Sequence, residues 1–315
     1  MPCAIALRIA ATAILGCLAL AGGLCPKGSP GPSDITETGL LSYITRDDAG
    51  GSALFVANIE GSVLSQVGMG LSPPLQPTDG VSLSPGRGRL VFAMPMSSTA
   101  RNDLYAINRD GSDRTQLTNT ADVSETDPDW CRTGDQIAFA TDGDIWVMRI
   151  DGSNRRNVTN TVDRDEADPS WSPDGLRIAY TLNPNSPNST VEVLELATGT
   201  RTPVAADPSL DDYGPSWSPD GEWIAYTSRS TQGTAETADI HRIHPDGTDD
   251  RGVTNAGGDL LCVGPAWSPK SDQLAFRGVR NGQIRADIYL INASGQGLRQ
   301  FTTSPSTSEV AVDWR

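Results

Sequence analysis

The side chains best suited to chemistry are carboxylates that precede a recurring tryptophan. Five residues before this tryptophan position, four of the six copies carry Asp or Glu, and further aspartates crowd the same region. The whole set is Glu125, Asp127, Asp165, Glu166, Asp168, Asp211, Asp212 and Glu309. Gathered at the mouth of a channel, these carboxylates would attract a cation, a metal ion or a peptide that bears Lys or Arg. The alternative is that they are the solvated ends of loops.

The rest of the chain offers little other chemistry. The two histidines are His241 and His244. His241 aligns with aromatic residues of other repeats, such as Trp146 and Tyr289, which indicates a packing position, and His244 leads into a turn. No Cys–His or Ser–His pattern indicates a nucleophile with its base, so we expect no catalytic residues, no metal ligands among His or Cys, and no cofactor beyond a cation in the channel.

The cysteines do not form a disulfide framework. Of the 5, three lie in or beside the N-terminal leader, and the others are Cys131 and Cys262. These two fall on opposite sides of the repeat array and at opposite ends of the equivalent strand. We therefore predict two unpaired thiols with a structural role.

The recurring tryptophan belongs to a repeat that must position all of these residues. Its reference positions, which lie 41 to 50 residues apart, are Leu83, Trp130, Trp171, Trp217, Trp267 and Trp314. Seven, eight and nine residues later come a branched apolar, a small and an aromatic residue, as in Ile178-Ala179-Tyr180. A strand with one bulky and one small face is what sheets stacked face to face require.

Each repeat reads as four strands, A to D. Strand A ends at the tryptophan, a Ser-Pro-Asp-Gly turn follows, and strand B carries the aromatic residue; residues 168–180 show this most clearly. A second hairpin then follows, as in residues 144–160, where Asp151-Gly152 forms the turn and strand D ends in Val-Thr-Asn. The many Asp-Gly pairs are therefore explained by turn geometry.

The two ends of the repeat array complement each other. The N-terminal part has strand B at residues 41–43, strand C at 53–58 and strand D after Glu60-Gly61, but it lacks strand A. Residues 308–315 form a strand A and nothing more. The prediction is an all-β, six-bladed β-propeller over residues 36–315, closed by the C-terminal strand A beside the N-terminal strands B to D, which removes exposed sheet edges.

The first residues read as an export signal. Arg8, an apolar run over residues 9–20 and Ala19-Leu20-Ala21 predict a signal peptide at 1–21, followed by a Pro/Gly/Ser-rich linker at 22–35. The expected location is secreted or periplasmic. Cys17 and Cys25 each follow a weak lipobox, so a lipid anchor to the outer membrane at one of them is the alternative.

Composition narrows the classes of partner. Counting 24 Lys and Arg against 39 Asp and Glu gives a net charge of −15. Nucleic-acid binding needs a basic face and is therefore not expected. Such a charge also keeps a surface soluble, and we expect a monomer.

The Trp-Ser-Pro-Asp-Gly…Ile-Ala-Tyr repeat resembles the WD40-like repeat of the TolB-type six-bladed propeller over about residues 36–315. The resemblance implies a non-enzymatic role in contacts between cell-envelope proteins. The repeat also occurs in prolyl-oligopeptidase-type peptidases, but no G-x-S-x-G elbow is present. TolB carries an α/β domain ahead of its propeller, whereas only 35 residues precede this one. Leu83, Cys131-Arg132 and Lys270-Ser271 depart from the repeat.

Topology predicts where partners bind. The A–B and C–D turns share one face of a propeller and are regular here, whereas the B–C and D–A loops of the other face are uneven, as at residues 94–102, 182–188 and 228–238. Function usually lies on irregular loops held by a rigid scaffold. The first hypothesis is thus an exported protein-binding module that uses this loop face. The alternatives are a carbohydrate lyase or a peptidase-like hydrolase, and a cation or small ligand held in the channel.

Overall fold

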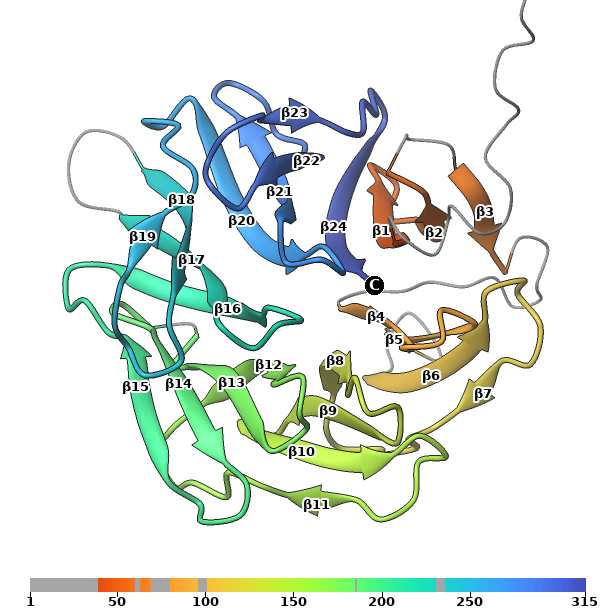
Figure 1. Cartoon of the computed structure of the whole chain (residues 1–315). Helices are drawn as coiled ribbons and strands as arrows, with labels where there is room; N and C mark the ends of the chain where they lie inside the picture. The colour runs from red at the N-terminus through yellow and green to blue at the C-terminus, as the bar shows by residue number, and fades with distance from the viewer. Residues whose placement is uncertain (1–38, 60–62, 69–79, 96–100, 185, 231–235) are drawn as a thin grey trace, which may run out of the picture.

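In the computed structural model, six four-stranded sheets lie as blades around a central axis (Figure 1). The structure describes residues 39–59, 63–68, 80–95, 101–184, 186–230 and 236–315. The predicted signal peptide and linker lie outside these ranges and stay predictions. Within the described residues, no helix is both long enough and apolar enough to cross a membrane.

Each blade runs outward from strand A at the axis to strand D at the rim, and neighbouring strands are antiparallel. The A strands are β4 (Val81–Leu83), β8 (Glu125–Trp130), β12 (Glu166–Trp171), β16 (Asp211–Trp217), β20 (Leu260–Trp267) and β24 (Thr307–Trp314). The B strands are β5 (Arg89–Pro95), β9 (Gln136–Thr141), β13 (Arg177–Leu182), β17 (Ile224–Ser230), β21 (Gln273–Arg280) and β1 (Leu41–Asp47). The C strands are β6 (Asn102–Asn108), β10 (Asp144–Arg149), β14 (Thr190–Glu195), β18 (Thr237–Ile243), β22 (Asp287–Asn292) and β2 (Ser52–Ala57). The D strands are β7 (Thr115–Gln116), β11 (Arg156–Asn157), β15 (Arg201–Ala205), β19 (Arg251–Gly252), β23 (Arg299–Gln300) and β3 (Val63–Val67).

The predicted ring closure is confirmed. The first blade has the strand order β24-β1-β2-β3, so the last strand of the chain pairs with the first (Figure 1). The register sets Leu41 opposite Trp314 and Tyr43 opposite Val312. We number this blade 1 and the others 2 to 6 in chain order, so that blade 2 begins at β4 and blade 6 at β20.

The complementary faces of strand B pack as the sequence pattern predicts. The buried Ala179 of blade 4 lies in one apolar cluster with Trp217, Ile224 and Tyr226 of blade 5. Ala225 of blade 5 meets the equivalent bulky residues of blade 6 in the same way. Because every joint between blades is filled by side chains from both sheets, each blade depends on its neighbours for its core.

The D strands of blades 2, 3, 5 and 6 have only 2 residues each and are shorter than the sequence pattern predicts. In blade 3, β11 ends at Asn157 and does not continue through Val158-Thr159-Asn160. The Thr159 hydroxyl replaces the ladder there, since it accepts a hydrogen bond from the Ile145 amide at 2.9 Å and donates one to Asp144 Oδ1 at 3.1 Å. A side chain that bonds to the backbone in this way competes with strand pairing and ends the strand.

Candidate functional site in the central channel

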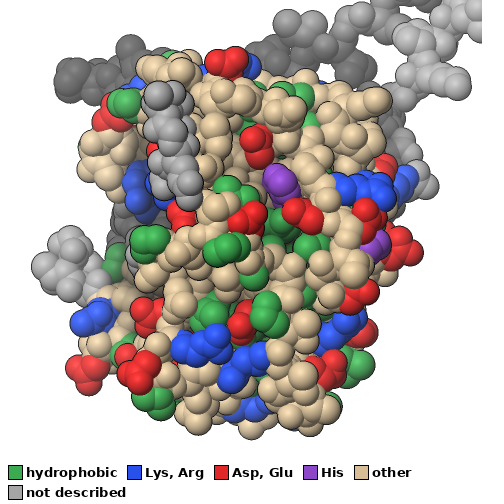
Figure 2. Space-filling view, turned by 90° about the vertical axis from the view of Figure 1, so that its left-hand side faces the viewer, with side chains coloured by type: hydrophobic (Ala, Val, Ile, Leu, Met, Phe, Trp, Pro, Cys, Tyr) green, Lys and Arg blue, Asp and Glu red, His purple; other side chains and the backbone are tan. Residues whose placement is uncertain are grey.

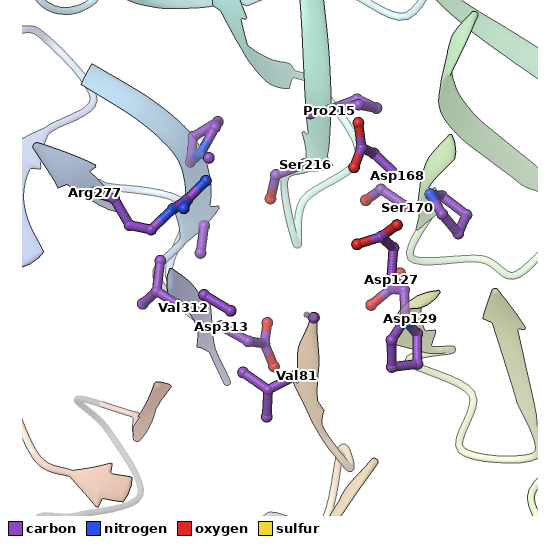
Figure 3. Close-up of a pocket in the computed structure, with 18 of the residues that line it drawn as sticks. Val81, Asp127, Asp129, Asp168, Ser170, Pro215, Ser216, Arg277, Val312 and Asp313 are labelled. Carbon is purple, nitrogen blue, oxygen red and sulfur yellow. The ribbon is translucent and has the colours of Figure 1, made fainter. Parts of the chain in front are cut away.

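A cavity of about 190 Å³ occupies the centre of the ring, and the A strands form its wall. Figure 3 shows the carboxylates of Asp127, Asp129 and Asp168 along one side of this space, with Arg277 on the opposite side. One wall of the channel is therefore acidic, and the facing wall carries a guanidinium beside apolar groups such as Val312.

A bulge in strand A brings two of these carboxylates into the channel. In blades 3 to 6 the register between strands A and B shifts by one residue just before the tryptophan. The residue three before the reference position has a left-handed backbone in blades 2 to 6, being Gly80, Gly214 or Gly264 in three blades but Asp127 (φ 50°) and Asp168 (φ 51°) in the others. Glycine adopts this conformation without steric cost, whereas an aspartate is strained there. Strain of this kind concentrates at sites with a function.

Asp168 is held in place by strand B of its own blade, which is linked in turn to the next blade. The Thr181 hydroxyl donates to Asp168 Oδ2 at 2.8 Å and accepts a hydrogen bond from the Gly214 amide at 2.9 Å. Burial raises the pKa of Asp168, while the hydrogen bond from Thr181 and the Arg277 guanidinium oppose that rise. The carboxylate thus points at the channel from a fixed position.

The bulge also explains why the eight predicted site residues do not form one collar. Glu125 lies opposite Thr141, and Trp130 lies opposite Ile137, so five residues of strand A span four of strand B. The glutamate therefore shares the bulky, blade-facing side of the strand with the tryptophan. If side chains are assumed to alternate strictly along strand A, with no bulge, Glu125 is placed on the channel side.

The structure divides the eight residues into three groups. Asp127 and Asp168 line the channel cavity. Asp165 is exposed on the loop between β11 and β12, and half-buried Asp211 accepts a hydrogen bond from the Asn188 amide at 2.7 Å. The third group is buried in the joints between blades and comprises Glu125, Glu166, Asp212 and Glu309. The binding role expected of the eight stays a prediction.

The A–B turn end of the channel carries an ion-pair network that the sequence analysis missed. Arg315 Nη2 contacts Asp129 Oδ1 at 2.5 Å, and its Nε contacts Asp313 Oδ2 at 3.3 Å. Asp129 Oδ2 also accepts the Trp171 amide, and Asp313 Oδ2 accepts the Leu83 amide, each at 2.7 Å. Both carboxylates therefore link their own blade to other blades through these hydrogen bonds and ion pairs.

A signal for this network was present in the sequence. The residue just before the tryptophan position is Ser or Asp in five repeats, namely Ser82, Asp129, Ser170, Ser216 and Asp313. The Ser82 and Ser170 hydroxyls accept the amides of Trp130 and Trp217 in the next blade at 3.0 and 2.9 Å. Arg277 was also detectable, because the equivalent position holds Ala or Thr in other repeats, as at Ala140 and Thr181.

The histidines lie far out in blade 5, away from the channel. His241 Nδ1 is 3.2 Å from Asp250 Oδ1, which also accepts a hydrogen bond from the Tyr226 hydroxyl at 2.8 Å. Burial works to lower the pKa of His241, but Asp250 outweighs it and the net pKa is raised. His244 stacks on Trp223 with ring centroids 4.0 Å apart.

The two cysteines are as predicted, since Cys131 and Cys262 are unpaired and buried. Burial raises the pKa of the Cys262 thiol to about 12, which makes it inert as a nucleophile. Across the described ranges, no group of three or more His, Cys, Asp or Glu residues is placed to hold a metal ion.

Residues 37–260 match the TolB beta propeller domain. The chain belongs to the TolB β-propeller family. TolB from Acinetobacter baumannii superposes with a TM-score of 0.70 at 15% identity, covering 88% of this chain and 66% of that one. A putative TolB from Agrobacterium tumefaciens gives 0.63 at 16% identity, covering 88% of this chain and 99% of that one. The chain thus spans just under two thirds of the Acinetobacter protein.

The same fold also occurs in enzymes. Oligogalacturonate lyase from Vibrio parahaemolyticus superposes with a TM-score of 0.55 at 12% identity, covering 85% of this chain and 74% of that one. Likeness at this identity shows the fold alone. No curated protein matches the chain in sequence.

Proposed function

We propose that this TolB-type propeller is a non-enzymatic, monomeric protein-binding module of the cell envelope, and that its partner binds the face made by the B–C and D–A loops. The observation that carries the proposal is the exposure of two large apolar side chains on loops of that face. Among the described residues, the two most exposed large apolar side chains are Ile284 (89%) and Val162 (84%). Ile284 lies between β21 and β22, and Val162 lies between β11 and β12, so both project from this loop face.

The charge of the loop face supports a partner with a basic segment. Its exposed carboxylates in the described ranges are Asp48, Asp122, Asp142, Asp163, Asp165, Asp207, Glu236 and Asp259. The exposed basic residues at the same end of the blades, again within those ranges, are Arg101 and Arg280, the last residue of β21. Charge complementarity of this kind accelerates association and selects the partner.

The flank of the molecule differs from the loop face. Figure 2 shows acidic and basic side chains interspersed over the side that lies at the left of Figure 1, with small, separate apolar groups between them. A surface with mixed charges and no continuous apolar area is typical of solvent contact. This contrast favours the loop face over the flank as the docking surface.

Envelope location rests on the family and on the predicted signal peptide. We propose export to the periplasm, with a lipid anchor at Cys17 or Cys25 as the second form. Mass spectrometry of the mature N-terminus tests this directly. A free N-terminus after residue 21 supports plain export, and a lipid-modified cysteine supports anchoring. An intact Met1 in envelope fractions would contradict both.

Substitutions on the two faces test the docking surface. We expect Val162→Asp, Ile284→Asp and Asp165→Lys each to weaken capture of the partner at least about tenfold, as hot-spot and charge substitutions do. The measurement is cross-linked capture from envelope extract, followed by titration of the captured protein. Glu166 and Asp212 are unsuitable for charge reversal because they are buried.

Matched controls exist on the opposite face. Leu176 (58% exposed) and Leu298 (49% exposed) lie in an A–B and a C–D turn, and Glu222 is exposed in another A–B turn. We expect Leu176→Asp, Leu298→Asp and Glu222→Lys to leave capture unchanged. If the turn-face variants lose capture and the loop-face variants keep it, the proposed surface is wrong.

A second candidate function is the binding of a cation or small cationic ligand in the channel. The strained Asp127 and Asp168 favour it, because both carboxylates face the cavity from positions where the other bulged strands hold glycine. Asp127→Gly is expected to abolish binding of Ca²⁺ or an alkylammonium ion while raising stability by up to about 1 kcal/mol through relief of strain. Calorimetric titration with each probe is the measurement, and unchanged binding by the variant would exclude this site.

A further inference from the structure

Two joints between blades each bring a buried glutamate close to a half-buried aspartate. In each joint, a glutamate meets an aspartate of the preceding blade. The glutamate lies five residues before the tryptophan position, and the aspartate is the first residue of strand C. Glu166 of blade 4 lies in this way within hydrogen-bonding reach of Asp144 of blade 3. Glu309 of blade 1 lies in the field of Asp287 of blade 6.

At the first joint, Asp144 takes most of the available donors. Its Oδ1 accepts the Thr161 amide at 2.9 Å, and its Oδ2 accepts the Asn157 side-chain amide at 2.8 Å. The Thr161 hydroxyl has one hydrogen and lies 2.7 Å from Glu166 Oε1, against 3.5 Å from Asp144 Oδ1. Glu166 Oε2 is buried and accepts no hydrogen bond from the described residues. The joint therefore lacks one hydrogen-bond donor, the one that Glu166 Oε2 would need.

The second joint repeats the arrangement. Asp287 Oδ2 accepts the Gln300 side-chain amide at 2.7 Å, and its Oδ1 accepts the Ser304 amide at 3.2 Å. The Ser304 hydroxyl donates to Glu309 Oε1 at 3.2 Å. Glu309 Oε2 is buried and accepts no hydrogen bond from the part of the chain that the structure describes.

A third joint shows what the first two lack. Glu125 of blade 3 is equally buried beside Asp103 of blade 2, but Arg155 Nη2 lies 2.9 Å from its Oε1. The Thr120 hydroxyl bonds to the same oxygen, and the Thr118 hydroxyl bonds to Oε2 at 3.2 Å. No such cation is paired with Glu166 or Glu309 within the described ranges. A buried pair of carboxylates without a cation is costly unless a proton neutralises one of them.

We propose that Glu166 and Glu309 are protonated in the folded ring, so that each of these two joints holds a proton that is released when the joint opens. The inference rests on the fold and does not depend on the proposed partner site. Both joints lie next to D–A loops, since Glu166 and Glu309 stand in the A strands that follow those loops.

Within the described ranges, no ion pair involves either glutamate, and at the first joint Arg201 Nη2 donates to the Thr159 carbonyl instead. Glu166 faces Asp144 of β10 and lies in the field of Tyr180 of β13. Glu309 faces Asp287 of β22 and Tyr43 of β1. Burial raises the pKa of Glu309 to about 7, and it raises the pKa of Glu166 against the hydrogen bond from Thr161.

The sign of the pH dependence follows from these raised pKa values. A carboxyl whose folded pKa exceeds its unfolded value stabilises the fold fully below the unfolded pKa, which for Glu is about 4.3, and this stabilisation is lost as the pH rises through the folded pKa. For Glu309 the loss is therefore complete only above pH 7. Each proton so held changes the unfolding equilibrium constant by up to about tenfold per pH unit.

The test uses the neutral isosteres Glu166→Gln and Glu309→Gln. The amide of each can donate to the facing aspartate, so it imitates the protonated acid at every pH. We expect each variant to unfold in urea like the wild type near pH 4, below the unfolded pKa of Glu, and to have at least about a fivefold smaller unfolding equilibrium constant at pH 8. Wild-type pH dependence that persists in the double variant would overturn the proposal.

Glu125→Gln is the matched control. This substitution removes the negative charge of Glu125 but leaves its cation, Arg155, in place. It should therefore raise the unfolding equilibrium constant at pH 8, whereas Glu166→Gln and Glu309→Gln should lower it. The carboxyl-carbon NMR shifts of the wild type give a second test that needs no variant. Shifts of ionised Glu166 and Glu309 at pH 5.5 would contradict the proposal even if a variant failed to fold.

Discussion

Replacing Arg315 by methionine is expected to destabilise the propeller by about 3–5 kcal/mol, the usual cost of removing one partner from a buried ion pair. The Arg315 side chain is 8% exposed. It contacts Asp313 of its own blade, Ser82 of blade 2 and Asp129 of blade 3. Burial raises the pKa of Asp129 although Arg315 opposes that rise, so loss of the guanidinium removes the largest of the influences that oppose it.

The cost should exceed that of an ordinary contact because both carboxylates also hold other blades. Asp129 accepts the amide of Trp171 in blade 4, and Asp313 accepts the amide of Leu83 in blade 2. Loss of the guanidinium therefore weakens the joint between blades 1 and 2 and the joint between blades 3 and 4. The backbone bonds between Arg315 and Leu40 do not involve the side chain and remain, so the variant reports on the network alone.

Urea unfolding at pH 7 is the measurement, and Arg251→Met is the matched control. Arg251 lies 2.6 Å from Asp249, but its side chain is 55% exposed, so the pair is expected to contribute less than about 1 kcal/mol. Asp129→Asn in the Arg315→Met background should recover part of the loss, since it removes the orphaned charge. Equal costs for Arg315→Met and Arg251→Met would show that the closing network contributes no more than a surface pair.

The ring itself could be predicted because its cause is periodic. The alternation of Ile, Ala and Tyr in strand B reports which face meets which blade, and the half-blade at each end permits one closure. The partner strand β24 was therefore identifiable before any coordinates. The same logic located Cys131 and Cys262 on separate blades, where they are unpaired.

The site could be predicted only in part, because one bulge reverses the side-chain alternation of strand A. The signal was visible as glycine three residues before the tryptophan position, at Gly80, Gly214 and Gly264. At the other two bulged positions an aspartate replaces the glycine, so the bulge cannot be recognised there. Aspartate can take this place because it tolerates the left-handed backbone better than most residues do. Without the bulge, Glu125 and Asp127 appear to share one environment, whereas one is sealed in a joint and the other lines the channel.

The second substitution with a large expected effect lies in the joint that contains Glu125. Arg155→Met is expected to cost about 3–5 kcal/mol at pH 8, because it leaves a fully buried carboxylate beside Asp103 with no cation. The Asp103–Glu125 joint then resembles the Asp144–Glu166 joint. Glu125 should respond as Glu166 is proposed to do, by taking up a proton.

The cost of Arg155→Met must then depend on pH with a definite sign. A proton on Glu125 neutralises the buried charge that the variant leaves without a cation, so the penalty shrinks toward pH 5. Adding Glu125→Gln should restore most of the loss at pH 8, because the amide needs no cation. Urea unfolding of the wild type, both single variants and the double variant at pH 5 and pH 8 measures this. The Arg155 guanidinium also lies 5.5 Å from the Phe139 ring centroid, so a penalty that is equal at both pH values and persists in the double variant would assign the effect to packing, not to charge.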